Sequence, residues 1–279
     1  MPLRGFAINR ALVVGISDYP RLKQKDASWS QIHGANDALM IKKTLKQQGF
    51  QVATLINKDA TAANIRKALD RLQSQATRGD IVYIHFSCHG QPVEDMNGDE
   101  ADGWDEAIVA YDAWKIAVKG IYEGKCHIVD DELNKRFISL RKKIGTAGFV
   151  YVVVDACHSG SIDRGEENDE MEFVRGTKLG FSISHKKYMP RIDARPNIPI
   201  KSEKGMADIC MLEACRSYQS NYEFKQNGTY YGPLSFYVNQ VLNHHKLSAD
   251  DRWIREVKKL MDNNPMLVRQ NMVIQTTRQ

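Results

Sequence analysis

A cysteine and a histidine that lie far apart in the sequence each follow a short apolar segment. Cys157 comes soon after the β-branched run 149–154, and His89 closes another apolar run, 81–86. Runs of this kind are typical of buried parallel strands, whose carboxyl ends meet at one edge of a sheet. A thiol and an imidazole that meet at such an edge are the groups needed for acyl transfer by a thiolate nucleophile.

Peptide hydrolysis requires a nucleophile, a general acid–base and donors that stabilise the oxyanion. An unperturbed thiol has a pKa of about 8.5, so a neighbouring imidazole is needed to raise the thiolate fraction. We therefore assign Cys157 as the nucleophile and His89 as the general acid–base that later protonates the leaving amine. The backbone amides of Gly90 and Cys157 are the candidate donors to the oxyanion. Two alternatives are a buried, inert Cys157 thiol and His158 as the base, although adjacent side chains at a strand end should diverge.

The motifs around both residues resemble those of the caspase-like cysteine peptidases, and specifically the metacaspases and their bacterial relatives. The matching blocks follow the family's order through most of the chain: residues 11–16, 34–38, 86–90, 97–106, 127–132 and 155–160. The resemblance implies the caspase-haemoglobinase fold and a cysteine-type endopeptidase with protein or peptide substrates. It leaves two rival functions open, a catalytically silent interaction module and a thiol amidase or transpeptidase that lacks an acidic pocket.

Acidic residues near the two motifs indicate the substrate preference. A pocket for Arg or Lys needs carboxylates that replace the lost solvation of the cation. Asp155 lies two residues before the nucleophile, and Asp37 opens the first expected helix. In metacaspases the corresponding acidic residues, with the serine that matches Ser87, bind a basic P1 side chain, so the resemblance implies cleavage after Arg or Lys. The alternatives are that Asp37 only interacts with a helix dipole and that Asp155 is a structural hydrogen-bond acceptor.

The acidic loop 95–106 offers the hard oxygen ligands that calcium prefers, although its spacing does not fit an EF-hand. The resemblance implies an activating calcium ion held by Asp105, Asp130 and Asp131, with Asp163 as a looser fourth position. The alternative is that Asp130 caps the following helix while the other carboxylates are solvated. No organic cofactor is expected.

Strand-like and helix-like segments alternate along the chain, which predicts an α/β fold with a mainly parallel central sheet flanked by helices on both faces. Strands are expected at 12–16, 50–56, 81–86, 149–154, 206–212 and 272–276, and a hairpin at 106–111. Helices are expected at 35–48, 130–141, 234–243 and 249–260, and one more is capped by Thr61. We expect a single peptidase domain over 1–279. Its long charged loop, 161–205, is either a solvated surface loop or a processing site.

Composition is ordinary for a soluble globular protein, with 42% hydrophobic and 26% charged residues and a net charge of +5. No basic stripe with interleaved aromatic residues is present, so nucleic-acid binding is not expected. No apolar run approaches the roughly 20 residues that span a bilayer, and the N-terminus lacks a signal-peptide pattern. The five cysteines form no paired framework, which favours a reducing compartment and hence the cytoplasm. The resemblance to metacaspases favours a monomer.

Three other residues carry a thiol or an imidazole, and we expect them to have structural roles only. Cys88 stands where the family has Gly or another small residue, and we interpret it as a tolerated replacement. His85 lies close to Cys88 and His89, but zinc sites repeat such paired ligands further along the chain, and that repeat is absent. Cys215 is likewise interpreted as structural.

Overall fold

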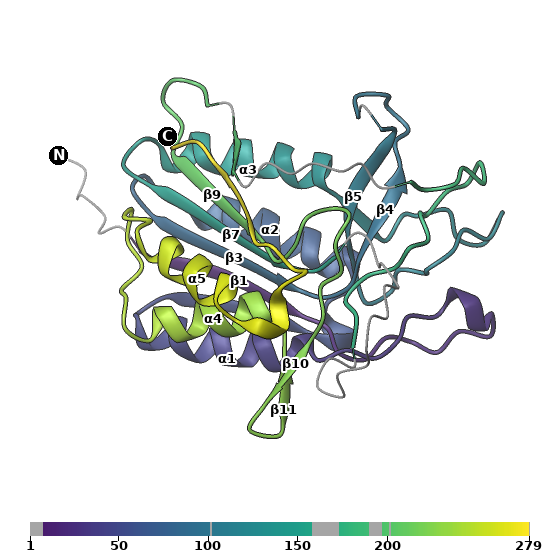
Figure 1. Cartoon of the computed structure of the whole chain (residues 1–279). Coiled ribbons are helices and arrows are strands. Elements are labelled where there is room, and N and C mark those ends of the chain that lie inside the picture. Colours follow the sequence, from purple (N-terminus) through teal and green to yellow (C-terminus); the bar gives the residue numbers. More distant parts are fainter. Residues whose placement is uncertain (1–7, 101, 158–172, 190–196, 201, 279) are drawn as a thin grey trace.

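The computed structural model describes residues 8–100, 102–157, 173–189, 197–200 and 202–278, and the statements below concern these residues. Seven strands form the main sheet: β1 Arg10–Gly15, β2 Gln51–Ile56, β3 Ile81–Ser87, β7 Phe149–Asp155, β8 Asn197–Pro199, β9 Asp208–Glu213 and β12 Val273–Thr276. Their order is β2-β1-β3-β7-β9-β12-β8 (Figure 1). The first five strands in this order are parallel, β12 is antiparallel to β9, and β8 is parallel to β12.

Helices cover both faces of this sheet (Figure 1). Their bounds are α1 Gly34–Gln47, α2 Ala62–Gln75, α3 Asp130–Ile144, α4 Pro233–Leu242 and α5 Trp253–Asp262, with short 3-10 turns at Lys25–Ala27, Asn57–Asp59 and Pro265–Leu267. Alternate strand residues point to opposite faces. Leu12 and Val14 therefore pack with α2 and α3, whereas Ala11 and Val13 pack with α1, α4 and α5.

Two smaller sheets lie beside the main one. β4 Gly90–Glu94, β5 Trp104–Val109 and β6 His127–Val129 form an antiparallel sheet, and β10 Phe224–Gln226 pairs with β11 Thr229–Tyr231. The β10–β11 hairpin projects from the lower edge of the molecule in Figure 1. Among the described residues, no helix has the length and apolarity that crossing a membrane would require.

The strand register brings the expected motifs to one edge. Ser87 at the end of β3 is paired with Asp155 at the end of β7, so the residues that follow both strands emerge side by side. β3 is hydrogen-bonded to β1 on its other side, and α1 begins at Gly34 beside the same edge. A Cβ atom on Gly34 would lie 2.1 Å from the Ser87 carbonyl oxygen, so this close approach of helix to strand requires glycine.

The structure confirms the expected α/β class with a mainly parallel sheet flanked by helices. The hairpin expected at 106–111 is wrong, because β5 ends at Val109 and is the central strand of a three-stranded sheet. β4, β6, β8, β10 and β11 were not expected; each has five residues or fewer, too few to show a clear period. The loop 161–205 is also not uniform: the described residues 173–189 pack against the body of the protein, and 158–172 lie outside the described residues.

Candidate active site

His89 is buried just after β3, and its ring is held by the chain around it. Nε2 lies 2.9 Å from the Ser30 carbonyl oxygen. Because a carbonyl can only accept, Nε2 carries the proton and Nδ1 presents its lone pair. The ring stacks on Trp29 with 4.8 Å between centroids and also contacts Tyr19. Burial lowers the pKa of His89 to about 4, so the imidazole is neutral in this arrangement.

Cys157 follows β7, and its thiol is also buried. Sγ donates to the Gln219 carbonyl oxygen at 2.8 Å, and the same oxygen lies 3.6 Å from the Cys215 sulfur. Among the described residues, no group hydrogen-bonds Nδ1 of His89. The thiol and the imidazole therefore share one edge without being hydrogen-bonded to each other.

The two expected oxyanion donors converge on one atom. The amides of Gly90 and Cys157 donate to the carbonyl oxygen of Arg175 at 3.1 and 3.0 Å. Arg175 belongs to the described part of the charged loop, which the sequence did not connect with the site. The two amides are thus positioned to stabilise charge on a carbonyl oxygen, and a carbonyl oxygen of this chain is bonded to them.

The Arg175 side chain enters a buried pocket of acidic groups, here called the arginine pocket: Asp37, Ser87, Asp155 and Glu223. Its Nη2 lies 2.7 Å from Asp37 and 2.7 Å from Glu223, and its Nη1 lies 2.6 Å from Ser87 Oγ and 3.4 Å from an Asp155 carboxylate oxygen. The carboxylates and the guanidinium are fully buried. The three residues expected for the P1 pocket therefore surround one arginine side chain.

The arginine pocket has an excess of negative charge, with three carboxylates around one guanidinium. Burial raises the pKa of Asp37 to about 7, while the nearby Arg175 and Ser87 act in the opposite direction. Burial also opposes ionisation of Glu223, but Arg175 and His33 outweigh it and hold its pKa at about 2. The carboxylates in turn raise the pKa of Arg175 against the effect of its burial. The pocket consequently favours a cation strongly.

Other contacts fix the pocket walls. Asp155 accepts from Asn221 Nδ2 and from the Ser235 amide, both at 2.7 Å, so it is a structural acceptor as well as a wall of the pocket. The Gly232 amide donates to Asp37 at 3.2 Å. A Cβ atom on Gly232 would lie 2.4 Å from the Arg175 guanidinium, so any other residue here would narrow the pocket.

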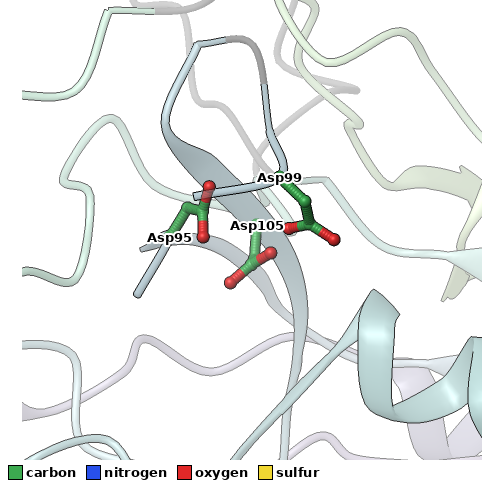
Figure 2. Close-up of side chains that lie close together, drawn as sticks. All are labelled: Asp95, Asp99 and Asp105. Atoms are coloured by element: carbon green, nitrogen blue, oxygen red, sulfur yellow. The ribbon is translucent and has the colours of Figure 1, made fainter. Parts of the chain in front are cut away.

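A second acidic region lies on β5, α3 and the loop between β4 and β5. Its cavity of about 410 Å³, here called the acidic cavity, is lined in part by Glu100, Asp102, Asp105, Glu106, Asp130 and Glu213. Figure 2 shows Asp105 beside Asp95 and Asp99, and one oxygen from each lies within 4.8 Å of the others. Asp131 instead accepts from Asn97 and Lys135. The three residues expected to bind calcium are thus neighbours, but Asp105 is grouped with two loop carboxylates that the sequence had not assigned.

Burial and mutual repulsion act on the acidic cavity. They raise the pKa of Asp105 to about 6, that of Asp130 to about 7 and that of Glu213 to about 8. Asp130 Oδ1 is buried and has no hydrogen-bond partner among the described residues. Such a set of oxygens fits a divalent cation of the calcium type. Asp163, the looser fourth position, lies outside the described residues.

The remaining candidates have structural surroundings. His85 bonds Tyr83 and Ser235 at 3.1 and 3.0 Å and is fully buried, as expected for a satisfied core residue. Burial raises the pKa of Cys88 to about 12, so this thiol stays protonated. The pKa of Cys215 is raised by its contact with Cys157 and by burial. His158 lies outside the described residues.

The family assignment follows from comparison with known proteins. A family model described as the caspase domain matches residues 8–276. The chain belongs to this family. A crystal structure of a protein from Geobacter sulfurreducens matches with a TM-score of 0.63 and 20% identity over 96% of this chain and 93% of that one, a likeness that shows the fold.

Metacaspases are among the relatives of this caspase-domain chain. It is 24% identical to metacaspase-1 of Mycosarcoma maydis over 90% of this chain and 67% of the relative. It is 32% identical to metacaspase-3 of Arabidopsis thaliana over 56% of this chain and 41% of the relative. The chain thus spans between about two fifths and two thirds of the length of these relatives. The similarities support a cysteine peptidase of the caspase family.

Proposed function

We propose that this chain is a cysteine endopeptidase that cleaves peptide bonds after Arg or Lys. Cys157 is the nucleophile, His89 is the general acid–base, and the amides of Gly90 and Cys157 bind the oxyanion. Asp37, Ser87, Asp155 and Glu223 bind the P1 cation. One observation carries the proposal: the arginine whose guanidinium fills the acidic pocket also has its carbonyl oxygen on both amides.

In this mechanism the Ser30 carbonyl fixes the tautomer of His89, so that Nδ1 can take the thiol proton. The thiolate attacks the carbonyl carbon, and the two amides stabilise the charge that develops on its oxygen. The imidazolium then protonates the leaving amine. The described geometry supports this sequence once the Cys157 thiol turns from Gln219 towards His89.

The pocket contacts favour Arg over Lys. Nε and Nη2 of Arg175 both donate to Glu223, Nη2 also lies 2.7 Å from Asp37, and Nη1 donates to Ser87. A lysine ammonium can neutralise the same carboxylates but cannot reach all of them from one atom. We therefore expect both residues to be accepted, with Arg preferred.

The test is hydrolysis of fluorogenic peptide amides that end in Arg, Lys or Asp. Wild type should cleave the Arg and Lys peptides, and Cys157→Ala should lower kcat by about 10⁴-fold or more. Cys126→Ser is the matched control, because Cys126 is a buried thiol bonded to Asp112, outside this site. Hydrolysis of the Asp peptide alone would overturn the P1 assignment. Absence of hydrolysis with and without calcium would favour a silent interaction module, and hydrolysis only of small non-peptide amides a thiol amidase.

We also propose that Asp105, Asp130 and Asp131 contribute to a calcium site at the acidic cavity. The support is the buried, unpartnered Oδ1 of Asp130 among the described residues and the crowding of carboxylates around Asp105. A bound calcium ion would supply the positive charge that balances these carboxylates. Calorimetric titration of the protein with calcium should show binding that Asp130→Asn weakens. Equal affinity in the two proteins would contradict the assignment of Asp130.

A further inference from the structure

The thiol of Cys215 lies beside the thiol of Cys157 in the candidate active site. Both sulfurs bond one acceptor, the carbonyl oxygen of Gln219, from which the Cys157 and Cys215 sulfurs lie 2.8 and 3.6 Å away. The separation of the two sulfurs therefore cannot exceed these two distances taken together. The two side chains also contact each other, and neither cysteine is in a disulfide. The peptidase mechanism uses Cys157 and gives no role to Cys215.

The register of the main sheet explains why the two thiols meet. Cys157 follows β7 and Cys215 follows β9, which are neighbouring parallel strands. The Ala214 amide donates to the Val154 carbonyl at 3.1 Å, so the two chains still run side by side as they leave the sheet. Neighbouring strands lie about 4.8 Å apart, and the Cα atoms of disulfide-bonded cysteines lie about 4.4–6.8 Å apart. The geometry of the sheet is therefore compatible with a disulfide between Cys157 and Cys215.

The loop that follows β9 holds the shared acceptor in place. The Gln219 amide donates to the Arg216 carbonyl at 2.9 Å. The Gln219 side chain accepts from the amides of Arg216 and Asn271 at 3.2 and 3.0 Å, and it donates to the Asn271 side chain at 2.7 Å. Because these contacts fix the Gln219 carbonyl, the two sulfurs stay close together. A bond between them needs rotation of the cysteine side chains rather than movement of the loop.

The other three cysteines have different surroundings. Cys88 lies on the other motif, next to His89, and burial raises its pKa to about 12. Cys126 donates to Asp112. Cys210 lies within β9, and burial raises its pKa to about 12. Because oxidants attack the thiolate form, Cys88 and Cys210 are expected to react slowly.

The thiols of Cys157 and Cys215 differ in how readily they ionise. Cys157 is the thiol that His89 deprotonates in the peptidase mechanism. Cys215 stays protonated, because its contact with Cys157, its burial and the nearby charges of Glu106 and Glu213 all raise its pKa. An oxidant that attacks thiolates should therefore react first with Cys157, and Cys215 should react with the product.

We propose that Cys157 and Cys215 form a site of reversible oxidation, at which a hydroperoxide converts the two thiols into a disulfide that blocks the nucleophile until a thiol reductant restores it. Cys215 thereby protects Cys157, because a sulfenic acid that finds no thiol is oxidised further to sulfinic acid. The disulfide itself does not depend on peptidase activity, whereas its effect on hydrolysis rests on the function proposed above.

The oxidation takes two steps. The Cys157 thiol gives its proton to Nδ1 of His89, and its sulfur bonds to the terminal oxygen of the hydroperoxide. The O–O bond breaks, and the leaving oxygen takes the proton from His89, which gives water when the oxidant is hydrogen peroxide. The Cys215 sulfur then bonds to the sulfenic sulfur of Cys157, whose hydroxide leaves with the Cys215 proton as water. The two thiols lose two electrons and the peroxide gains them. A dithiol reductant reverses the reaction by thiol–disulfide exchange.

Treatment with hydrogen peroxide, followed by peptide mapping without reductant, tests the disulfide. Wild type should lose the mass of two hydrogen atoms and yield linked peptides that contain residues 157 and 215, and dithiothreitol should separate them. Cys126→Ser is the matched control, because it removes a buried thiol that bonds Asp112 instead, and it should form the same linkage. A linkage of Cys157 to Cys88, or an unlinked Cys157 sulfinic acid in wild type, would overturn the proposal.

The role of Cys215 is tested by the activity that returns after oxidation with excess peroxide. Hydrolysis of an arginine peptide by wild type should fall about 10³-fold or more, as expected for loss of the nucleophile, and dithiothreitol should restore it. Cys215→Ser should also lose activity, but its Cys157 should become sulfinic acid, which dithiothreitol does not reduce. Each protein is compared with its own activity before oxidation. Equal recovery of wild type and Cys215→Ser would overturn the role of Cys215.

The two measurements distinguish failure of this proposal from failure of the proposed function. Linkage of residues 157 and 215 in a protein that hydrolyses no peptide in either redox state would support the oxidation site and count against the peptidase. An active peptidase in which these residues never become linked would overturn the oxidation site alone. Because the mapping is made on wild type, its outcome does not depend on the folding of a variant.

Discussion

Two groups of carboxylates, one fully buried and one only partly buried, differ in how their charge is balanced. In the arginine pocket a guanidinium lies among three carboxylates, and donors from Ser87, Asn221 and two backbone amides complete their hydrogen bonds. Arg216 lies in the wall of the acidic cavity, but Oδ1 of Asp130 is buried without a hydrogen-bond partner among the described residues. Burying charge is costly unless it is paired.

The two groups also differ in what lies among their carboxylates. The arginine pocket holds one planar cation, the guanidinium of Arg175, which contacts Asp37, Glu223 and Ser87. The acidic cavity is lined by carboxylates from the loop 95–106, β5, α3 and β9, and such oxygen ligands suit an ion that can adapt its coordination. We therefore propose that charge compensation serves substrate binding in the arginine pocket and binding of a metal ion in the acidic cavity.

The largest expected effect is the loss of kcat/KM when one carboxylate of the arginine pocket is neutralised. Asp155→Asn keeps the shape of the side chain but leaves the guanidinium with one carboxylate fewer, so kcat/KM for an arginine peptide should fall about 100- to 1000-fold. Asp250→Asn, at an exposed carboxylate paired with Arg252, is the control and should leave kcat/KM unchanged. A loss of less than threefold in Asp155→Asn would show that the pocket does not bind the P1 residue.

A second experiment changes the charge of the acidic cavity in two ways, by removing one carboxylate and by adding calcium. Without calcium, Asp130→Asn should keep or raise Tm, because it removes one of several mutually repelling charges. In wild type, calcium at about 100 times its Kd should raise Tm by about 5–10 °C, and the variant should lose this rise. Calorimetric or fluorescence melting measures both. A lower Tm in the calcium-free variant would contradict the interpretation that Asp130 is uncompensated.

The pH dependence of cation binding tests whether the charge of Asp37 contributes to the arginine pocket. Since its pKa is raised to about 7, Asp37 gains negative charge as pH rises through 7 and should then bind a guanidinium more tightly. The inhibition constant of agmatine, a small guanidinium compound, should decrease about tenfold between pH 6 and pH 8. Asp37→Asn should bind agmatine more weakly and show no such dependence. If the inhibition constant of the wild type did not change with pH, Asp37 would not titrate in this range.

The smallest effect separates the exposed from the buried carboxylates near Asp105. Asp99 is exposed, so its charge is screened by solvent, and Asp99→Asn should change calcium affinity by about threefold or less. Asp130→Asn should weaken calcium binding much more. If Asp99→Asn had the larger effect in the same titration, the ion would belong to the Asp95–Asp99–Asp105 group shown in Figure 2.

The sequence alone determined the elements whose signals are local. The apolar runs that become β3 and β7 could be recognised from a few consecutive residues, and so could Thr61, whose Oγ1 accepts from the Asn64 amide at the start of α2. Once two parallel strands were expected, the positions of His89 and Cys157 at one sheet edge followed. Asp37, Ser87 and Asp155 followed from family resemblance, which assigns individual positions.

Only the tertiary structure identified the groups that meet these residues from distant parts of the chain. Ser30 contributes a backbone carbonyl, and the type of a residue does not predict such a contact. Glu223 binds Arg175, which lies 48 positions earlier in the sequence. Arg175 is one of many basic residues in a loop without periodicity. Its role depends on its ion pairs with buried carboxylates, which are distant in the sequence. Local patterns indicate the longer strands and helices, whereas charge pairing in a buried pocket is decided by the packing of the whole chain.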